Sequence, residues 1–507
     1  MANSSPGTLS ESVHAGDPRS RDSDGMTTFS AVVTTGIYCL PWCGAQPLPG
    51  HVRPYSSAAA AEAAGYRACL RCRPYRTEPP IGRGAPELVC RAVQLILDGA
   101  LDGKTEAELA ARLFVSGRHL RRLFQECLGA TPDQLARSAR THFARRLLDD
   151  TDLTIADIAL AAGFGSVRQL NRACRDVFRA PPRELRARRR ISDRLVADGG
   201  LLLRLPFQPP LDWDAMLGYL GARAIPGVES VSDDTYRRTV VIDGDPGVLE
   251  LSPGGPGHLF LRAHLPHWEG LIHIVRRARR IMNLDADVAA ASDHLESDPL
   301  IGPLVRSRPG ARPPGSWDPF ETAVRAIVGQ QVGVGRANTF TGQIVASQGT
   351  PSPGLGPLGL THVFPSAETL AHADLGGLGL IPERAHALNT FARAVADGII
   401  RLDRGSRVDD LVASITALPG IGPWTAHHIA LRLGYADAYP SNDVGIRRAL
   451  SDAQGRSVSP HVAEEMAERW RPWRAHAVFW LWSSVPGRTE RRTSGTGSTL
   501  ITQFAGA

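Results

Sequence analysis

The sequence of 507 residues lacks the features of a membrane or secreted protein. It contains no apolar run of 18 residues, and residues 1–23 are polar without the apolar centre of a secretory signal. We therefore expect the protein in the reducing cytoplasm, where paired cysteines favour metal over disulfides. No cysteine follows Cys174, which argues against an iron–sulfur cluster in the C-terminal half.

Lysine is nearly absent, so arginine supplies almost all of the positive charge. The formal net charge of +6 at pH 7 fits a polyanionic partner, although many basic proteins bind nothing charged. The length and the hydrophobic content of 43% predict three or four domains with ordinary cores.

Composition and periodicity predict a multidomain α+β protein of seven segments. Polar ends are expected to be a disordered leader (1–23) and tail (486–507). Strands are expected at 201–207, 238–244 and 258–265, and a loop at 348–360. Between the ends we expect a compact cysteine-containing unit, a Pro/Gly linker, an all-helical domain, a mixed α/β subdomain and a second helical domain, at residues 24–76, 77–86, 87–190, 200–285 and 286–485.

Four of the seven cysteines form two tight pairs, with the spacing C-x3-C…C-x2-C: Cys39, Cys43, Cys69 and Cys72. Four thiolates at this spacing suit one tetrahedral zinc ion. Zinc holds a thiol deprotonated, and four thiolates on one zinc leave a sulfur electron-rich enough to attack a carbon. The alternative is a zinc site with a structural role alone.

The stretch from TTGIYC to ACLRC resembles the N-terminal domain of Ada-type DNA methylphosphotriester repair proteins, over about residues 24–75. The resemblance implies that Cys39 is both a zinc ligand and the methyl acceptor, and that Thr35 and Arg67 contact the DNA backbone. Methylation removes one negative charge near a polyanion, so it should strengthen DNA binding. The chain departs from the family at positions that often carry basic residues and are here Leu40, Gln46 and Leu70.

An internal repeat follows, because HLRRLFQECLGATP (119–132) recurs as QLNRACRDVFRAPP (169–182). Two helix–turn–helix motifs explain it, with recognition helices expected at 116–127 and 166–177. Residues 87–190 resemble the two-motif DNA-binding domain of AraC-type regulators, which follows the zinc domain in Ada proteins and implies RNA polymerase as a partner. The candidate contacts to DNA bases and phosphates are Arg118, Arg121, Arg168, Gln169, Asn171 and Arg172. The alternative for some of the arginines is that they only solvate a helix face. The single cysteines Cys90, Cys127 and Cys174 are expected in the core.

The segment LPGIGPWTAHHIALRLGYADAYPSNDVGI contains a helix–hairpin–helix pattern. Gly420 and Gly422 permit a tight turn and close approach to a DNA phosphate, to which the next helix offers free N–H groups. This motif also occurs in ligases, polymerases and nucleases. Asp443, about twenty residues later, matches the carboxylate of base-excision glycosylases with this hairpin.

Together with FETAVRAIVGQQVGVGRAN and RPWRAHAVFWLW, this segment resembles AlkA-type 3-methyladenine DNA glycosylases over about residues 200–485. The resemblance implies that Trp424 and Trp482 face a flipped cationic base, that Gln331 fills the gap it leaves, and that Asp443 stabilises the reacting sugar. It also allows a monovalent cation at the hairpin carbonyls near Thr416 and Leu418. The family pattern has an apolar wedge at Gln331 and aromatic residues at His428 and Ser483, so a shifted substrate range is expected.

Glycosylases that nick DNA use a lysine just after the hairpin, but here Pro423 and Trp424 follow Gly422. We therefore expect a monofunctional enzyme. The Pro-Cys-His-Arg motif of O6-methylguanine repair is also absent, so that activity is not expected. The sequence predicts a nucleoid-associated bacterial protein that senses alkylation, activates transcription and excises alkylated bases. The alternative is a regulator whose glycosylase half only binds DNA.

Overall fold

The structure is a computed structural model that describes residues 29–45, 47–77, 81, 84–197 and 200–484. The predicted leader, the tail, Gln46 and half of the predicted linker lie outside these residues. The chain forms two compact units. Of the described residues, the first unit comprises those up to 207 with 267–276 and 404–406, and the second comprises 208–266, 277–403 and 407–484.

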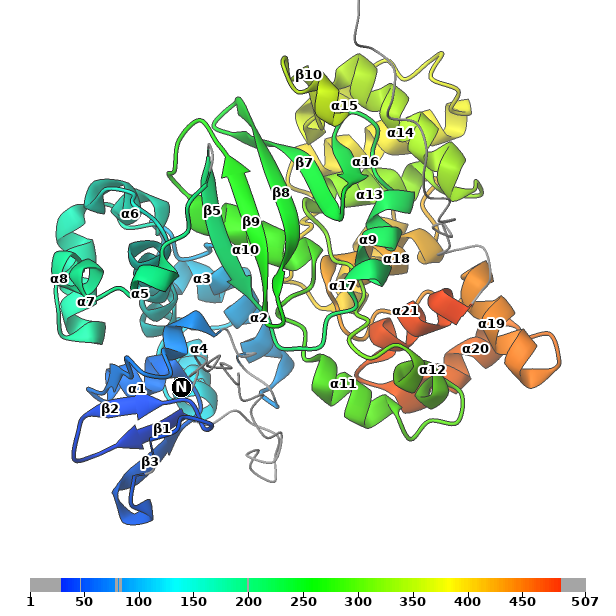
Figure 1. Cartoon of the computed structure of the whole chain (residues 1–507). Helices are drawn as coiled ribbons and strands as arrows, with labels where there is room; N and C mark the ends of the chain where they lie inside the picture. The colour runs from blue at the N-terminus through cyan, green and yellow to red at the C-terminus, as the bar shows by residue number, and fades with distance from the viewer. Residues whose placement is uncertain (1–28, 46, 78–80, 82–83, 198–199, 485–507) are drawn as a thin grey trace, which may run out of the picture. The chain divides into compact units, whose positions relative to one another are not determined.

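The first unit begins with a small four-stranded sheet in the order β3-β1-β2-β4 (Figure 1). Strand β1 pairs antiparallel with β2 and β3, whereas β2 pairs parallel with β4. The parallel pairing brings the ends of β2 and β4 together. Cys39 is the last residue of β2 and Cys43 follows it, whereas Cys69 and Cys72 come after β4. The elements are β1 (Phe29–Val32), β2 (Ile37–Cys39), η1 (Pro49–His51), β3 (Val52–Tyr55), α1 (Ala58–Ala63), β4 (Arg67–Ala68) and η2 (Pro74–Arg76).

Seven helices follow, and the internal repeat appears as two helix pairs, α3–α4 and α6–α7, joined by the long helix α5. Serine N-caps explain where the two predicted recognition helices begin, since Ser116 accepts from His119 N–H and Ser166 from Gln169 N–H. The elements are α2 (Glu87–Leu97), α3 (Glu106–Arg112), α4 (Gly117–Leu128), α5 (Pro132–Asp150), α6 (Ile155–Ala161), α7 (Val167–Phe178), α8 (Pro182–Ala187), η3 (Ile191–Asp193) and β5 (Leu201–Pro206).

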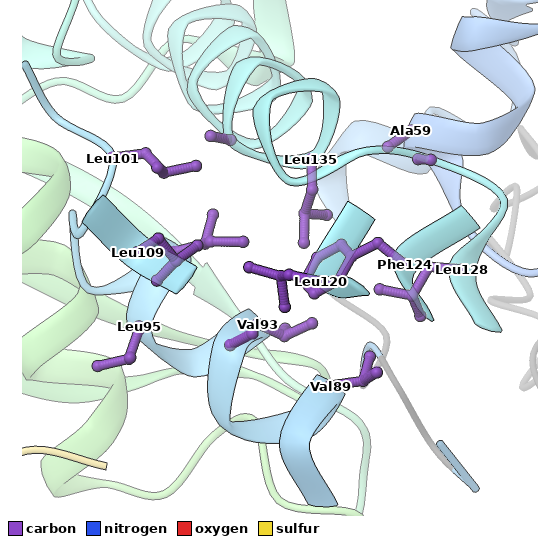
Figure 2. Packing of buried hydrophobic residues seen from close by; sticks show 14 of the residues in the cluster. Ala59, Val89, Val93, Leu95, Leu101, Leu109, Leu120, Phe124, Leu128 and Leu135 are labelled. Carbon is purple, nitrogen blue, oxygen red and sulfur yellow. The ribbon is translucent and has the colours of Figure 1, made fainter. Parts of the chain in front are cut away.

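One hydrophobic core joins the small sheet domain to the first helix pair. Ala59 of α1, Leu128 of α4 and Leu135 of α5 belong to one cluster of buried residues (Figure 2). Leu120 and Phe124 of α4 are completely buried in this cluster. The core therefore fixes one face of α4 and leaves its opposite face to solvent.

The second unit contains an antiparallel sheet in which β6, β7, β8 and β9 are successive neighbours, and helix α9 precedes it. The sequence predicted β7 and β9 but missed β6 and β8. Strand β8 carries Pro246, Gly247 and Pro253, which are unusual inside strands, and a bulge lies between Pro253 and Gly255. The elements are α9 (Trp213–Ala222), β6 (Glu229–Ser232), β7 (Thr235–Ile242), β8 (Asp245–Gly255) and β9 (His258–His264).

Helices form most of the rest of the second unit. The segment expected to be a loop (348–360) contains the short strand β10, which pairs with β11 just beyond the segment. None of the helices in the described part of the chain combines the length and hydropathy that crossing a lipid bilayer requires. Helix α10 (Leu271–Ile281) has residues in both units. The elements that follow it are α11 (Val288–Leu295), α12 (Ile301–Ser307), α13 (Pro319–Val328), α14 (Val334–Gln348), β10 (Thr350–Pro351), η4 (Gly356–Leu358), β11 (His362–Val363), α15 (Ala367–His372), α16 (Pro382–Ala396), α17 (Val408–Thr416), α18 (Pro423–Leu433), α19 (Val444–Gln454), α20 (Pro460–Ala467), η5 (Glu468–Trp470) and α21 (Arg474–Ser484).

Candidate functional sites

The four paired cysteines form one cluster in the first unit. Their sulfur atoms all lie within 4.8 Å of one another. A tetrahedral zinc site with Zn–S bonds of about 2.3 Å requires sulfur separations of about 3.8 Å. The donor set and its geometry therefore fit one zinc ion held by Cys39, Cys43, Cys69 and Cys72.

The four sulfurs differ in their hydrogen bonds. Backbone N–H groups of Leu40 and Arg71 donate to the sulfurs of Cys72 (3.4 Å) and Cys69 (3.3 Å), and the Ala45 N–H donates to Cys43. Among the described residues, no backbone N–H donates to the sulfur of Cys39. A hydrogen bond withdraws electron density from a thiolate, so the backbone donors of the described residues act on the other three sulfurs and not on that of Cys39.

The cluster is also electrostatically crowded. The hydrogen bond between the Cys39 and Cys72 thiols, together with burial, raises the pKa of Cys39 far above its ordinary value. The same hydrogen bond lowers the pKa of Cys72 to about 6. Four thiolates at this separation need a cation, which supports the assignment of the cluster to zinc.

Residues expected to contact DNA near this cluster lie on neighbouring segments. Thr35 is exposed in the turn between β1 and β2, and Arg67 is half-buried on β4, opposite Ile37 of β2. Leu40 is buried, so its departure from the family pattern concerns the domain core. Leu70 is 39% exposed and presents an apolar side chain beside the cysteines.

The six residues proposed for DNA reading do not behave alike. Arg118, Arg168 and Arg172 are exposed on α4 and α7. Arg121 is exposed too, but its guanidinium lies 2.6 Å from the Glu106 carboxylate, a contact that joins α4 to α3. On α7, Gln169 accepts from the Gly165 N–H (3.0 Å), and the Asn171 amide donates to the Val167 carbonyl (2.9 Å). Of the six, Arg118, Arg168 and Arg172 are therefore exposed arginines for which the structure gives no such contact within the described residues.

The single cysteines lie in the helices of this domain. Cys174 is completely buried in α7, and burial raises its pKa to about 12. Cys90 and Cys127 are half-buried. In the described residues, the only cysteine cluster is the one at the ends of β2 and β4.

The helix–hairpin–helix pattern forms the turn between α17 and α18 in the second unit. Gly420 adopts a φ of +80°, and a Cβ added there would lie 2.9 Å from the Ala387 Cβ. Gly422 has an ordinary φ of −92° and is the N-cap of α18, and a Cβ there would meet nothing within 4 Å. Gly420 is therefore required by the turn itself, whereas Gly422 leaves open space in front of a helix N-terminus.

A cleft of about 820 Å³ lies beside this hairpin, wholly within the second unit. Both hairpin glycines line it, together with Gln331, Trp424, Asp443 and Trp482. The structure thus brings together residues that are separated by up to 151 positions in the sequence. Ser483 is not among the lining residues; its hydroxyl donates to the Phe479 carbonyl (2.9 Å) within α21.

Asp443 is 3% exposed and receives three N–H donors. It is the N-cap of α19, where Oδ1 accepts from the Ile446 N–H (2.9 Å), and Oδ1 also accepts from the Trp482 indole (2.9 Å). Oδ2 accepts from the Trp424 indole (3.0 Å). These donors hold the Asp443 carboxylate in a fixed position in the lining of the cleft.

Three aromatic rings lie beside this carboxylate. The rings of Trp424 and His428, one turn apart on α18, stack with centroids 5.3 Å apart. His428 also contacts the ring of Trp482 at 5.7 Å. Electron-rich ring faces next to a carboxylate attract a flat cation.

Gln331 lies in the loop between α13 and α14, where it is exposed and adopts a φ of +58°. Non-glycine residues in this conformation are often found at functional sites. The sequence did not single out its neighbour Gln330, whose amide donates to the Thr425 hydroxyl (2.8 Å) on α18. The only available signal was the adjacent pair of glutamines, which does not reveal which of the two is anchored.

The sequence also missed a buried ionic network in the cleft wall. Arg238 lies 2.7 Å from the Glu321 carboxylate and 4.6 Å above the Trp317 ring. Glu229 accepts from Arg325 (3.5 Å), so the network links β6, β7 and α13. Because its members are up to 96 residues apart, no local pattern could have predicted it.

Comparisons with known proteins find similarity in three parts of the chain. Three family models match: the metal binding domain of Ada (residues 13–75), a helix-turn-helix domain (109–188) and the AlkA N-terminal domain (202–318). The "DNA-3-methyladenine glycosylase 2" of Escherichia coli is 33% identical over 55% of this chain and 95% of its own length. The "Bifunctional transcriptional activator/DNA repair enzyme Ada" of the same organism is 36% identical over 30% of this chain and 41% of its own length.

One relative is similar along almost the whole chain. The "Probable bifunctional transcriptional activator/DNA repair enzyme AlkA" of Mycobacterium tuberculosis is 39% identical over 469 residues, which cover 90% of this chain and 92% of the relative. The chain therefore belongs to the family of bifunctional transcriptional activator/DNA repair enzymes, in which an Ada-type metal-binding domain and a helix-turn-helix domain are joined to an AlkA-type DNA glycosylase.

Proposed function

We propose that Cys39 accepts a methyl group from a methylphosphotriester in DNA. The observation that supports this choice is the hydrogen-bond pattern, since Cys39 alone among the four lacks a backbone donor in the described residues. Bound zinc keeps the sulfurs deprotonated at neutral pH and balances their charge. The Cys39 sulfur forms a bond to the methyl carbon while the carbon–oxygen bond breaks. The electron pair stays on the phosphate oxygen, and the products are a phosphodiester and an S-methylcysteine.

This transfer converts the chain into a stronger DNA binder. Methylation turns an anionic thiolate into a neutral thioether, so repulsion between the cluster and the phosphates falls. Thr35 and Arg67 contact the backbone beside the cluster, while Arg118, Arg168 and Arg172 read the operator from α4 and α7. RNA polymerase is the partner that the DNA-bound activator recruits, and we expect this recruitment to take place at the nucleoid.

The second unit excises alkylated bases such as 3-methyladenine. The supporting observation is the buried Asp443 carboxylate, held by two indole N–H groups in a cleft beside the glycine hairpin. The hairpin around Gly420 and Gly422 binds a DNA phosphate, and Gln331 fills the gap left by the flipped nucleotide. The cationic base stacks on the rings of Trp424, His428 and Trp482.

Asp443 stabilises the positive charge that develops on the sugar as the bond from C1′ to the base nitrogen breaks. The electron pair of this bond leaves with the base and neutralises its charge. Water adds to C1′ and loses a proton, which leaves an abasic site. No lysine follows the hairpin, so the strand stays intact.

One experiment tests both activities in the same tube. The zinc-loaded full chain is incubated with a methylated duplex that carries N-methylpurines and methylphosphotriesters. We expect free methylpurines by chromatography and one added methyl group on Cys39 by mass spectrometry. Absence of free bases would leave only the alternative, a regulator with a non-catalytic glycosylase-like domain, and absence of the added methyl would assign the zinc a structural role.

Two finer assignments belong to the same proposal. The domain limits are those expected above, with the zinc domain at 24–76, the DNA reader at 87–190 and the glycosylase at 200–485. The hairpin carbonyls of Thr416 and Leu418 stay candidates for a monovalent cation, which a potassium dependence of abasic-DNA binding would support.

A further inference from the structure

The short helix α1 of the zinc domain contacts the C-terminal ends of both recognition helices. Its N-cap residue, Ser57, is 4% exposed and donates through its hydroxyl to the Leu128 carbonyl at the end of α4 (2.9 Å). Just beyond its other end, the Gly65 carbonyl accepts from the guanidinium of Arg179, the C-cap residue of α7 (2.8 Å). One helix of six residues thus bridges the two motifs that read DNA.

The internal repeat has an asymmetry that α1 explains. Gly129 and Arg179 are equivalent C-cap residues of α4 and α7, and both adopt left-handed backbone conformations (φ of +65° and +59°). A Cβ at Gly129 would lie 3.0 Å from the Ala60 Cβ of α1, so a side chain there would press against α1 in a backbone conformation that already favours glycine. At the second position α1 leaves room, and the arginine side chain reaches back to Gly65. The non-glycine residue in a position that favours glycine is therefore accounted for by its contact with the zinc domain.

The contact with the first motif is also a packing contact. Ala59 and Ala60 of α1 belong to the same buried cluster as Leu120, Phe124 and Leu128 of α4 (Figure 2). Movement of α1 would therefore disturb the core that holds α4 in place.

The same helix is tied to the strand that carries the methyl acceptor. Glu62 of α1 accepts a hydrogen bond from the hydroxyl of Tyr38, the residue before Cys39 (2.6 Å). Its carboxylate also lies 2.6 Å from the imidazole of His142 on α5, the helix that joins the two motifs. Tyr38 is completely buried, so this connection runs through the interior of the first unit.

We propose that α1 is a strut that sets the separation and orientation of α4 and α7 and holds both helices at a fixed position relative to the strand of Cys39. Ser57 and Arg179 are then positioning residues for operator recognition. This inference rests on the proposed DNA-reading function. Bases read by α4 and α7 must lie at a defined distance from one another along the duplex. A strut that fixes this distance raises the affinity for the operator but not for other DNA. It also makes the phosphate that meets the cysteine cluster lie at a fixed offset from the bases that are read.

Glycine substitutions test the strut with little effect on folding. Ser57→Gly removes the hydroxyl but leaves a residue that is tolerated at an N-cap, and Arg179→Gly removes the guanidinium from a backbone conformation that favours glycine. Matched controls are Ser459→Gly, another serine N-cap in the second unit, and Arg183→Gln, an exposed arginine of α8. The arginine variants lose one positive charge, which weakens binding to operator and non-operator DNA alike. This effect therefore cancels in the ratio of the two affinities.

The probes are a duplex selected by the methylated wild-type protein from a random-sequence library and a scrambled duplex of the same length. Each strut variant is expected to lower the affinity ratio for the two duplexes by about fivefold, the effect of losing one hydrogen bond. The double variant is expected to lose little more than either single variant, because releasing one end already frees the strut. Ser57→Thr and Arg179→Lys, which keep a donor, are expected to restore the ratio, and the controls to leave it unchanged.

Methyl uptake from a non-operator triester duplex separates this inference from the proposed function, because it requires only the zinc domain. It is expected to stay within twofold of wild type in every variant. A double variant with a wild-type affinity ratio, or single losses that multiply, would overturn the strut while leaving the proposed function intact. A wild-type protein that selects no duplex would overturn both.

Discussion

Replacing Asp443 by asparagine should abolish base excision and loosen the cleft at the same time. The substitution removes the buried charge that faces the developing positive sugar. Two unit charges about 4 Å apart at an effective dielectric constant of about 20 interact by about 4 kcal/mol. A loss of this size lowers the rate of the chemical step by about a thousandfold.

The hydrogen bonds of Asp443 predict a second, structural effect. The amide oxygen of asparagine can take the place of Oδ1, which accepts from Ile446 and Trp482, but the amide nitrogen then replaces Oδ2 and faces the Trp424 indole N–H. Two donors in contact leave one unsatisfied in a buried site, which costs about 1–3 kcal/mol of folding stability. Adding Trp424→Phe to Asp443→Asn should restore stability but not activity.

The matched control is Asp318→Asn. Asp318 is also an N-cap aspartate, accepting from Phe320 and Glu321 at the start of α13, but it does not line the cleft. Asparagine caps helices as well as aspartate does, so this variant should fold and excise bases normally. The assay is release of methylpurines from methylated duplex under single-turnover conditions, with thermal unfolding in parallel. A rate within tenfold of wild type for a folded Asp443→Asn protein would refute the assigned role.

Three further predictions concern separate parts of the molecule. Cys39→Ser should lose methyl uptake, measured by mass spectrometry, and keep base excision, whereas Cys127→Ser should keep both; uptake by Cys39→Ser would identify another acceptor. Gly420→Ala should lose about 1–3 kcal/mol of folding stability because of the positive φ and the close contact with Ala387. Gly422→Ala should fold normally but bind an abasic-site duplex about tenfold more weakly, as measured by fluorescence anisotropy. Equal stability and equal DNA affinity of the two variants would contradict the separate roles of the two glycines. Burial lowers the pKa of His476 to about 3. The unfolded chain therefore binds a proton at His476 more readily than the folded chain, and folding stability falls as the pH drops from about 6.5 toward 3. Urea unfolding should show that His476→Phe removes about 2 kcal/mol of the stability loss between pH 7 and pH 5, and an unchanged pH dependence of stability would contradict this role of His476.

Local signals explain which parts of the fold could be predicted from the sequence. The cysteine spacing and the parallel pairing of short strands place all four sulfurs together. Ser116 and Ser166 mark the starts of both recognition helices, so their bounds were predicted to within one residue. Strand β8 was missed because its prolines and glycines imitate a loop, and only pairing with β7 and β9 makes it a strand.

Contacts between distant residues explain what could not be predicted. Asp443 and Trp482 were both proposed for the site, but they are 39 positions apart in the sequence, and no local sequence pattern predicts the hydrogen bond between them. Arg121 was proposed as a DNA contact, and its pairing with Glu106 depends on the angle between α3 and α4. The roles assigned to these residues stay predictions. The structure adds which of the side chains are exposed and which make contacts within the protein.

The two side chains that we propose as reactive groups differ in the hydrogen-bond donors that surround them. A nucleophile must share an electron pair with carbon, and each N–H donor makes that pair less available. The Cys39 sulfur, unlike those of Cys69 and Cys72, receives no backbone donor from the described residues. Asp443 instead receives three N–H donors, which fix its position and still leave its negative charge. A carboxylate held in this way is suited to electrostatic stabilisation and poorly suited to covalent attack. This difference in donors supports the proposal that the sulfur forms a bond with its substrate, whereas the carboxylate stabilises a sugar cation until water captures it.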